Sequence, residues 1–143
     1  MAQEQLIRSF YDAVNSQDFE RFTSFFADDG QFKDVSSDHV YRGKSEIRGM
    51  AEKWVKALPD MKFQLSNVIG SNDVFCVELS LVGTHKGPLD GPQGVIPASG
   101  KKVNVPACDV IRFRNGKIQS LNCYFAATIL LNQIGAMPSR QAA

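Results

Sequence analysis

The sequence has few of the residues that bind metals or form disulfides. Its two histidines, His39 and His85, lie far apart, and its three cysteines, Cys76, Cys108 and Cys123, show no CxxC spacing. We therefore expect no metal site. An odd number of cysteines without such spacing favours free thiols in a reducing cytoplasm. No glycine-rich motif follows a predicted strand and opens a predicted helix, so we expect no bound nucleotide and predict chemistry without a cofactor.

An excess of one charge and long apolar runs are also missing. Sixteen Lys and Arg residues against fifteen Asp and Glu leave a formal charge of +1, which argues against nucleic acid or a membrane surface as a partner. The apolar runs are too short for a transmembrane helix, and the polar start of the chain predicts no signal peptide. With 143 residues, 43% of them hydrophobic, we expect one soluble domain over residues 1–143 with its own core.

The first 60 residues carry the periodicity of helices. Apolar side chains recur at helical spacing over residues 3–15 and again over residues 44–58, where a proline follows. Between these two segments, a stripe of phenylalanines predicts a second helix. We expect Ser16 or Asp18 to cap its start and Gly30, in a left-handed conformation, to end it.

After the third predicted helix, hydrophobic alternation takes the period of two that is typical of strands. Including a short strand before that helix, we expect strands at residues 31–34, 61–65, 75–81, 103–113 and 121–125. Residues 35–41 are predicted as a polar loop, 87–100 as a long Gly- and Pro-rich connection, and 128–134 as a short helix or terminal strand. This order predicts an α+β fold, with three N-terminal helices on one face of a mostly antiparallel sheet. If the sheet curls, it encloses an apolar pocket suited to a hydrophobic small molecule.

Asp109 interrupts the apolar face of its own predicted strand. The other members of that face are all apolar: Val103, Val105, Ala107, Ile111 and Phe113. Because strand side chains alternate between faces, the Asp109 carboxyl should point inward. Burial would raise its pKa, and the neutral acid could then donate a hydrogen bond to a substrate oxygen. A bulge near Pro106 that turns Asp109 outward, or an inward Asp held by buried amides, is equally compatible with the sequence.

The hairpin after this strand decides which residues face Asp109. Asn115-Gly116 permits a two-residue turn, which would place Asn122 opposite Asp109, or a three-residue loop with Gly116 left-handed. The three-residue loop would align an apolar set with Asp109, namely Leu121, Cys123 and Phe125. Since this set suits an inward face better, we predict the three-residue loop.

Asp34 is the second candidate acid. It shares a strand face with Phe32 and precedes the predicted polar loop. At the mouth of an apolar cavity it would stay ionised and act as a base, forming a base-and-acid pair with Asp109. The same position also suits an exposed aspartate at the end of a strand that caps a turn.

Other side chains are candidates for contacts with a ligand. His85 follows a predicted strand end, where it would orient a substrate carbonyl or remain as a partly exposed histidine. Helix residues with large side chains could line the cavity or form plain core: Phe10, Phe26, Met50 and Trp54.

Short motifs spread over nearly the whole chain carry a family resemblance. In the second half they are Gly83-Thr84-His85-x-Gly87, Pro97-x-x-Gly100, Asp109-x-x-Arg112-x-x-Asn115-Gly116-Lys117-Ile118 and Gln133-Ile134-Gly135. In the first half they are Phe26-Ala27-Asp28-Asp29, Asp34, Tyr41-x-Gly43 and Ala57-Leu58-Pro59-Asp60. The motifs in the second half of the chain resemble SnoaL-type polyketide cyclase-like proteins. The motifs in the first half are similar to the wider nuclear transport factor 2-like superfamily, to which those proteins belong. This resemblance implies a cone-shaped curved sheet around three helices, often in a homodimer, in a superfamily of cyclases, isomerases, dehydratases and binding domains.

The resemblance to SnoaL-type cyclases also implies a position for the catalytic acid, which handles the proton in an aldol ring closure. In this sequence that position holds Cys123, and a second position that is acidic in many relatives holds Ala126. A cysteine in an apolar site is expected to be an inert thiol. Neither acid of the cyclases is therefore present.

The ketosteroid isomerases match differently. Resemblance to them implies a general base at Asp34 and a neutral, hydrogen-bonding acid at Asp109. Their oxyanion-hole tyrosine falls on Phe10. Tyr11 lies about 100° further around the helix, so we do not expect it to substitute directly, although it and His85 are candidate auxiliaries.

Two functions follow from the sequence. The first is an enzyme of the isomerase or cyclase type, in which Asp34 and Asp109 move a proton on a hydrophobic carbonyl compound through an enol or enolate. Its expected substrate contacts are Phe10, Tyr11, Trp54, His85, Cys123 and Phe125. The alternative is a non-catalytic domain, ligand-binding or dimeric, that has lost the cyclase acid.

Overall fold

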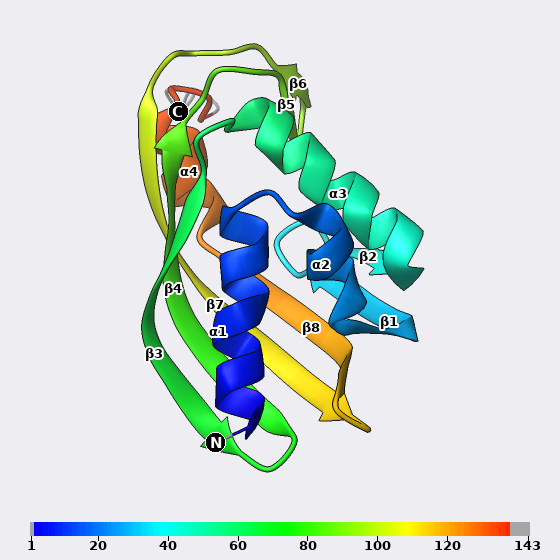
Figure 1. Cartoon of the computed structure of the whole chain (residues 1–143). Coiled ribbons are helices and arrows are strands. Elements are labelled where there is room, and N and C mark those ends of the chain that lie inside the picture. Colours follow the sequence, from blue (N-terminus) through cyan, green and yellow to red (C-terminus); the bar gives the residue numbers. More distant parts are fainter. Residues whose placement is uncertain (1, 138–143) are drawn as a thin grey trace.

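A curved six-stranded sheet forms one side of the molecule, and three helices fill its concave face (Figure 1). The computed structural model describes residues 2–137. The strands, in the spatial order of the sheet, are β2 (His39–Arg42), β1 (Phe26–Asp34), β8 (Lys117–Phe125), β7 (Lys102–Arg114), β4 (Val74–Thr84) and β3 (Lys62–Ser71). Neighbouring strands run antiparallel except β1 and β8, which are parallel. The predicted α+β class is thus confirmed.

The helices lie where the apolar periodicity predicts them. They are α1 (Ala2–Asn15), α2 (Phe19–Ser24), α3 (Gly43–Ala57) and α4 (Ala127–Gln133). Asp18, one of the two predicted caps, accepts the Arg21 backbone N–H at 3.1 Å and so begins α2. The last helix, α4, resolves the alternative of helix or strand for the C-terminal segment, and it packs against β7. Within the described residues, no helix is long and apolar enough to cross a membrane.

The prediction for the end of the second helix is wrong. The helix ends at Ser24, and Phe26 already begins β1. Gly30 lies inside that strand rather than in a left-handed turn. A Cβ at Gly30 would come within 2.9 Å of the carbonyl oxygens of Ala27 and Ile118. Glycine is therefore needed there for close approach of two backbones, not for a helix stop.

Two segments predicted as loops contain strands. The end of the predicted polar loop forms β2, which pairs antiparallel with β1 from Gln31–Arg42 to Asp34–His39. The long Gly- and Pro-rich connection folds into a small hairpin of β5 (Leu89–Gly91) and β6 (Gly94–Ile96). All three strands are too short for an alternating pattern to be visible in the sequence.

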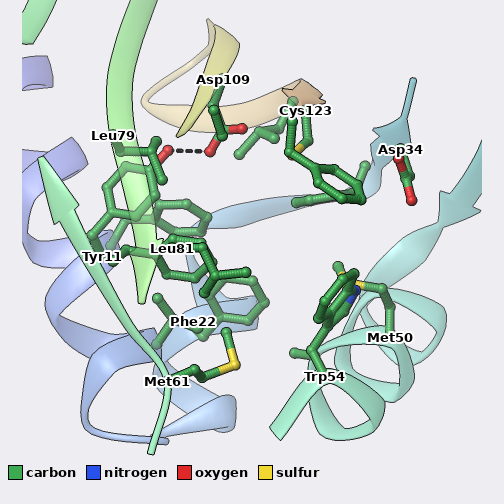
Figure 2. Close-up of a pocket in the computed structure, with 18 residues that line it drawn as sticks. Tyr11, Phe22, Asp34, Met50, Trp54, Met61, Leu79, Leu81, Asp109 and Cys123 are labelled. Carbon is green, nitrogen blue, oxygen red and sulfur yellow. Dashed lines mark hydrogen bonds between the residues drawn. The ribbon is translucent and has the colours of Figure 1, made fainter. Parts of the chain in front are cut away.

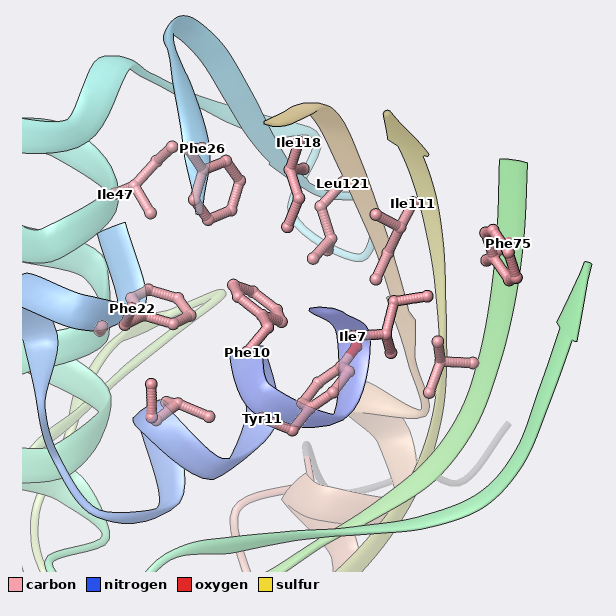
Figure 3. Close-up of a cluster of buried hydrophobic side chains, with 14 of the residues drawn as sticks. Ile7, Phe10, Tyr11, Phe22, Phe26, Ile47, Phe75, Ile111, Ile118 and Leu121 are labelled. Carbon is pink, nitrogen blue, oxygen red and sulfur yellow. The ribbon is translucent and has the colours of Figure 1, made fainter. Parts of the chain in front are cut away.

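The core fills the space between the helices and the concave face of the sheet (Figure 3). Side chains of α1, α2 and α3 meet side chains of β1, β4, β7 and β8 in one buried cluster. Its aromatic centre is Phe10, which stacks on Phe22 with ring centroids 4.9 Å apart and meets Phe26 edge-on. A second cluster, around Leu58, Leu81 and Leu130, closes the end of the sheet near α4.

Candidate functional site

Asp109 points into the molecule from the middle of β7, as its strand alternation predicts. The residue is 5% exposed. One carboxyl oxygen, Oδ2, accepts a hydrogen bond from the Tyr11 hydroxyl at 2.5 Å (Figure 2). The other oxygen, Oδ1, is buried and has no hydrogen-bond partner within the described part of the chain. One face of the carboxyl group is thus free to meet a ligand.

Burial dominates the electrostatics of Asp109. It raises the pKa of the carboxyl from 3.8 to about 6, although the hydrogen bond from Tyr11 and the neighbouring Cys123 thiol act in the opposite direction. A carboxyl group with this pKa exists in both protonation states near pH 6. It can therefore release or take up a proton under mild conditions.

Tyr11, one of the two candidate auxiliaries, reaches Asp109 with its hydroxyl group. Phe10, at the position of the oxyanion-hole tyrosine, packs in the aromatic core. Both side chains are 2% exposed, because α1 is buried over an arc wide enough to include two successive residues. Burial, followed by the charge of Asp109, raises the pKa of Tyr11 well above its usual value of 10.0. The hydroxyl therefore stays protonated and acts as a donor.

Three site residues lie side by side on neighbouring strands. Asp34 of β1 is in register with Cys123 of β8, and Cys123 is in register with Asp109 of β7. Adjacent strands are about 4.8 Å apart, so about 10 Å separates the backbones of the two acids. Burial raises the pKa of the intervening Cys123 thiol well above 9.0, and the charge of Asp109 raises it further. Cys123 is thus a neutral thiol between two carboxyl groups.

The β7–β8 hairpin produces this register in an unexpected way. The predicted three-residue loop is wrong, because Arg114 pairs with Lys117 across a two-residue turn in which both Asn115 and Gly116 have positive φ, 53° and 74°. A bulge between the pairs Phe113–Ile118 and Arg112–Ser120 then shifts the register by one residue. The predicted inward-facing set therefore faces Asp109 after all.

A cavity of about 80 Å³ lies in front of these residues. Figure 2 shows Asp109 and Tyr11 on one side of it and Asp34 on another, with Met50 and Trp54 of α3 opposite the sheet. Its lining contains the predicted contacts Phe10, Tyr11, Trp54, Cys123 and Phe125, and both acids. The sequence analysis missed most of the remaining lining residues, which are Val14, Phe22, Phe32, Met61, Phe63, Leu79, Leu81, Ala51, Ala107 and Leu121. Their alternation predicted an inward face but could not show which of them border the cavity.

Asp34 lies at the edge of this cavity and is half-buried. Its Oδ1 accepts hydrogen bonds from the Ser36 backbone N–H at 3.0 Å and from the Ser36 hydroxyl at 2.7 Å. Asp34 therefore caps the turn after β1, as one alternative predicts, and it also borders the cavity. Its second oxygen, Oδ2, is not engaged by this turn.

His85 does not line the cavity, and the prediction of a partly exposed histidine is also wrong. The side chain is fully buried, and its Nδ1 lies 2.8 Å from the Ser99 hydroxyl and accepts the Ser99 backbone N–H at 3.2 Å. Backbone hydrogen bonds with Gly100 and Lys101 hold His85 between the end of β4 and the start of β7. Its observed contacts fix the segment that enters β7.

Phe26 also lies outside the cavity lining. It is fully buried in the aromatic cluster instead, because it begins β1 rather than continuing α2. Among residues 2–137, no group of three or more His, Cys, Asp or Glu side chains is placed to hold a metal ion.

Comparison with known proteins places the chain in a family. A sequence model of the SnoaL-like polyketide cyclase family matches residues 5–134. The chain therefore belongs to the SnoaL-like polyketide cyclase family. No curated protein matches it.

Solved structures share the whole fold. TsrD from Streptomyces laurentii superposes with a TM-score of 0.82 at 22% identity, over 95% of this chain and 96% of TsrD. IdmH from Streptomyces antibioticus, a proposed polyketide cyclase, gives 0.78 at 20% identity, over 92% and 97%. A hypothetical protein with a ketosteroid isomerase-like fold from Catenulispora acidiphila, solved with trimethylamine, gives 0.77 at 19%, over 92% of each chain. At these identities the likeness establishes the fold alone.

Proposed function

We propose that this chain is a cofactor-independent enzyme that moves a proton on a hydrophobic carbonyl compound through an enol or enolate. One observation carries the proposal: a buried carboxyl group, Asp109, has one free oxygen at the wall of an apolar cavity. Membership of the SnoaL-like polyketide cyclase family supports a reaction of this class.

The chemistry divides between the two acids. When Asp109 is protonated at the oxygen that Tyr11 does not bond, this O–H group donates a hydrogen bond to the substrate carbonyl oxygen. The Asp34 carboxylate meanwhile removes a proton from the carbon beside that carbonyl. The electron pair of the broken C–H bond forms the C=C bond of the enol or enolate, and the carbonyl π electrons move to oxygen. Return of the proton from Asp34 to another carbon completes an isomerisation. In a ring closure the enol carbon instead attacks a second carbonyl carbon, the π electrons of that carbonyl move to its oxygen, and this oxygen takes the proton from Asp34.

The register of the sheet supports Asp109 as the acid of this chain. The resemblance to cyclases assigns their acid to the position of Cys123, and Asp109 lies directly opposite Cys123 on the next strand. Directly opposed side chains have Cβ atoms about 5 Å apart. A carboxyl group therefore remains beside the position that the cyclases use, supplied by β7 instead of β8.

One observation favours the alternative of a non-catalytic, ligand-binding domain. Both acids already have intramolecular partners, since Asp109 accepts from Tyr11 and Asp34 accepts from Ser36. The position of the cyclase acid holds a cysteine and the second acidic position an alanine. Under this alternative the cavity binds the ligand, and no C–H bond of the ligand exchanges its proton.

Proton exchange in heavy water tests the proposal. The wild-type protein should speed the replacement of hydrogen by deuterium beside the carbonyl of a panel of aryl and cyclic ketones, observed by NMR. Asp34→Asn and Asp109→Asn should each reduce the rate at least about 100-fold, the scale seen for lost acid–base groups. Asp12→Asn, an exposed site on the outer side of α1, is the control and should leave the rate unchanged. Binding of the ketones without any enhanced exchange would support the alternative.

A further inference from the structure

A second and larger space, here called the outer cleft, adjoins the cavity beside Asp109. The outer cleft has a volume of about 850 Å³, against about 80 Å³ for the inner cavity. Four residues border both spaces: Asp34, Met50, Trp54 and Phe125. The rings of Trp54 and Phe125 meet edge-on with centroids 5.8 Å apart. These four residues, here called the throat, form the boundary that the two spaces share.

The two compartments have different walls. The inner cavity is apolar except for the groups around Asp109 and the edge at Asp34. The outer cleft is bounded by the turn after β1, by β2, by the C-terminal half of α3, by the β5–β6 hairpin and by α4. Its polar side chains outside the throat are Ser36, Ser37, His39, Tyr41, Lys53, Lys56 and Asp90. The apolar part of the outer wall includes Leu89, Val95 and Leu131. A ligand that fills both spaces would therefore meet an apolar inner wall and an outer wall that mixes apolar with hydrogen-bonding side chains.

The charges around the outer cleft balance. Lys53 and Lys56 are offset by Asp34 and Asp90, and Lys53 binds Asp90 at 3.1 Å. A ligand group with a net charge would therefore find no excess of the opposite charge. The balance favours a neutral group that exchanges hydrogen bonds with hydroxyl, amine and carboxylate side chains.

Aromatic rings form part of the same wall. His39 and Tyr41 lie with ring centroids 4.4 Å apart, and Tyr41 contacts Phe32, which borders the inner cavity. The apolar faces of rings next to many hydrogen-bonding side chains suit a compact group with both C–H and O–H surfaces. Sugars and cyclic polyols have this character.

We infer that the outer cleft is a second ligand compartment, which holds a neutral, hydroxyl-rich substituent while the apolar carbonyl-bearing part of the same molecule occupies the inner cavity. The inference deepens the proposed function. It rests on that function for the statement that the part of the ligand in the inner cavity carries a carbonyl group. It names the substrate class as a ketone that carries a sugar-like or polyol extension. The throat sets the distance between the two ends.

Binding of matched aryl ketones tests the inference without requiring turnover. The probes are 4-hydroxyacetophenone, its O-β-glucoside, 4-butoxyacetophenone and 4-(carboxymethoxy)acetophenone, measured by titration calorimetry. The glucoside should bind the wild-type protein at least about tenfold more tightly than the parent phenol, since two net hydrogen bonds are worth about that factor. The butoxy and carboxymethoxy compounds should show no such gain.

A variant that blocks the outer cleft tests whether the glucoside gains its affinity there. Lys56→Trp on α3 fills the outer cleft from a residue that does not border the inner cavity. It should abolish the tenfold advantage of the glucoside and leave the affinity for 4-hydroxyacetophenone unchanged. Ser45→Trp, exposed near the other end of the same helix, is the control and should change neither affinity. Circular dichroism of both variants verifies that α3 is intact.

The outcomes separate this inference from the proposed function. Equal affinity for the phenol and its glucoside, an unchanged glucoside affinity in Lys56→Trp, or no binding of either compound would overturn the inference. A gain for the butoxy or carboxymethoxy compound instead would overturn the neutral, hydroxyl-rich character of the compartment. A glucoside advantage that Lys56→Trp removes, together with no proton exchange in heavy water, would uphold the inference and contradict the proposed function.

Discussion

At the scale of single residues, the molecule concentrates its electrostatic cost in one side chain. Asp109 is the buried acid of the sheet, and an apolar side chain there would pack without desolvating a charge. The hydrogen bond from Tyr11 reduces that cost, yet burial still governs the pKa of the carboxyl group. A buried carboxyl group with a raised pKa is typical of a site that transfers a proton near neutral pH.

The raised pKa of Asp109 makes stability depend on pH. The folded protein binds this proton more tightly than the unfolded chain, so the stability from Asp109 is fully present below pH 3.8 and is lost as the pH rises through about 6. A tenfold change in proton affinity is worth about 1.4 kcal/mol, so the loss is about 3 kcal/mol. Asp109→Asn removes the titration.

Urea unfolding of the two proteins across this pH range measures the effect. The unfolding free energy of the wild type, relative to Asp109→Asn, should fall by about 3 kcal/mol between about pH 3.5 and about pH 7.5. Asp12→Asn serves as the control, since an exposed aspartate on α1 should leave the wild-type pH dependence in place. Parallel curves for the wild type and Asp109→Asn would contradict a buried, desolvated carboxyl group.

At the scale of elements, the β7–β8 hairpin aligns the site. Its bulged residue, Gln119, lies between Ile118 and Ser120, which pair with adjacent residues of β7. If Gln119 instead paired with Arg112 in a regular ladder, β8 would slip by one position, and each side chain beyond Gln119 would move to the opposite face. The bulge is therefore what brings Cys123 opposite Asp109.

Deletion of Gln119 should cost little stability, because it removes only the unpaired residue and leaves every pair between β7 and β8 in place. Deletion of Asn122 should instead destabilise the fold by at least about 2 kcal/mol, because either Leu121 or Phe125 must then turn to the outer face of the sheet. Thermal unfolding monitored by circular dichroism compares both variants with the wild type. A Gln119 deletion that costs as much stability as the Asn122 deletion would contradict an unpaired residue at position 119.

The sequence was sufficient for the elements with strong periodicity and for the direction of Asp109. Alternation along residues 103–113 predicted the inward carboxyl group, and the helical spacing around Phe10 predicted α1. The sequence could not show that Tyr11 reaches Asp109, because that contact joins residues 98 positions apart and depends on the tilt of α1 over the sheet. The burial of His85 likewise arises from its hydrogen bonds to the segment before β7, which no local pattern encodes.

At the scale of the whole molecule, the two faces of the sheet differ. The concave face is covered by helices, while the opposite face carries exposed apolar side chains, among them Ile69, Val74 and Tyr124 at 58%, 41% and 48% exposure. Large apolar side chains gathered on one surface are typical of an interface. We propose that a second copy of the chain covers this face, in keeping with the homodimer that the family resemblance implies.

Sedimentation equilibrium tests the homodimer. The wild type should have about twice the mass of the 15.8 kDa chain, and Val74→Lys combined with Tyr124→Lys should shift it toward the monomer because like charges would then meet across the interface. Ser45→Lys, at an exposed position on α3 away from the outer face of the sheet, is the control for added charge alone. A wild type that stays monomeric at all concentrations would contradict the proposal.

The protonation of Asp109 tests the central claim most directly. Carbon-13 NMR of aspartate carboxyl groups, with the Asp109 signal assigned from Asp109→Asn, follows its titration in the wild type and in Tyr11→Phe, with Tyr124→Phe as the control. We predict a pKa of about 6 in the wild type and in the control. Tyr11→Phe should raise the pKa further, because the Tyr11 hydrogen bond lowers it. A pKa near 3.8, unchanged in Tyr11→Phe, would contradict a desolvated acid at the wall of the cavity.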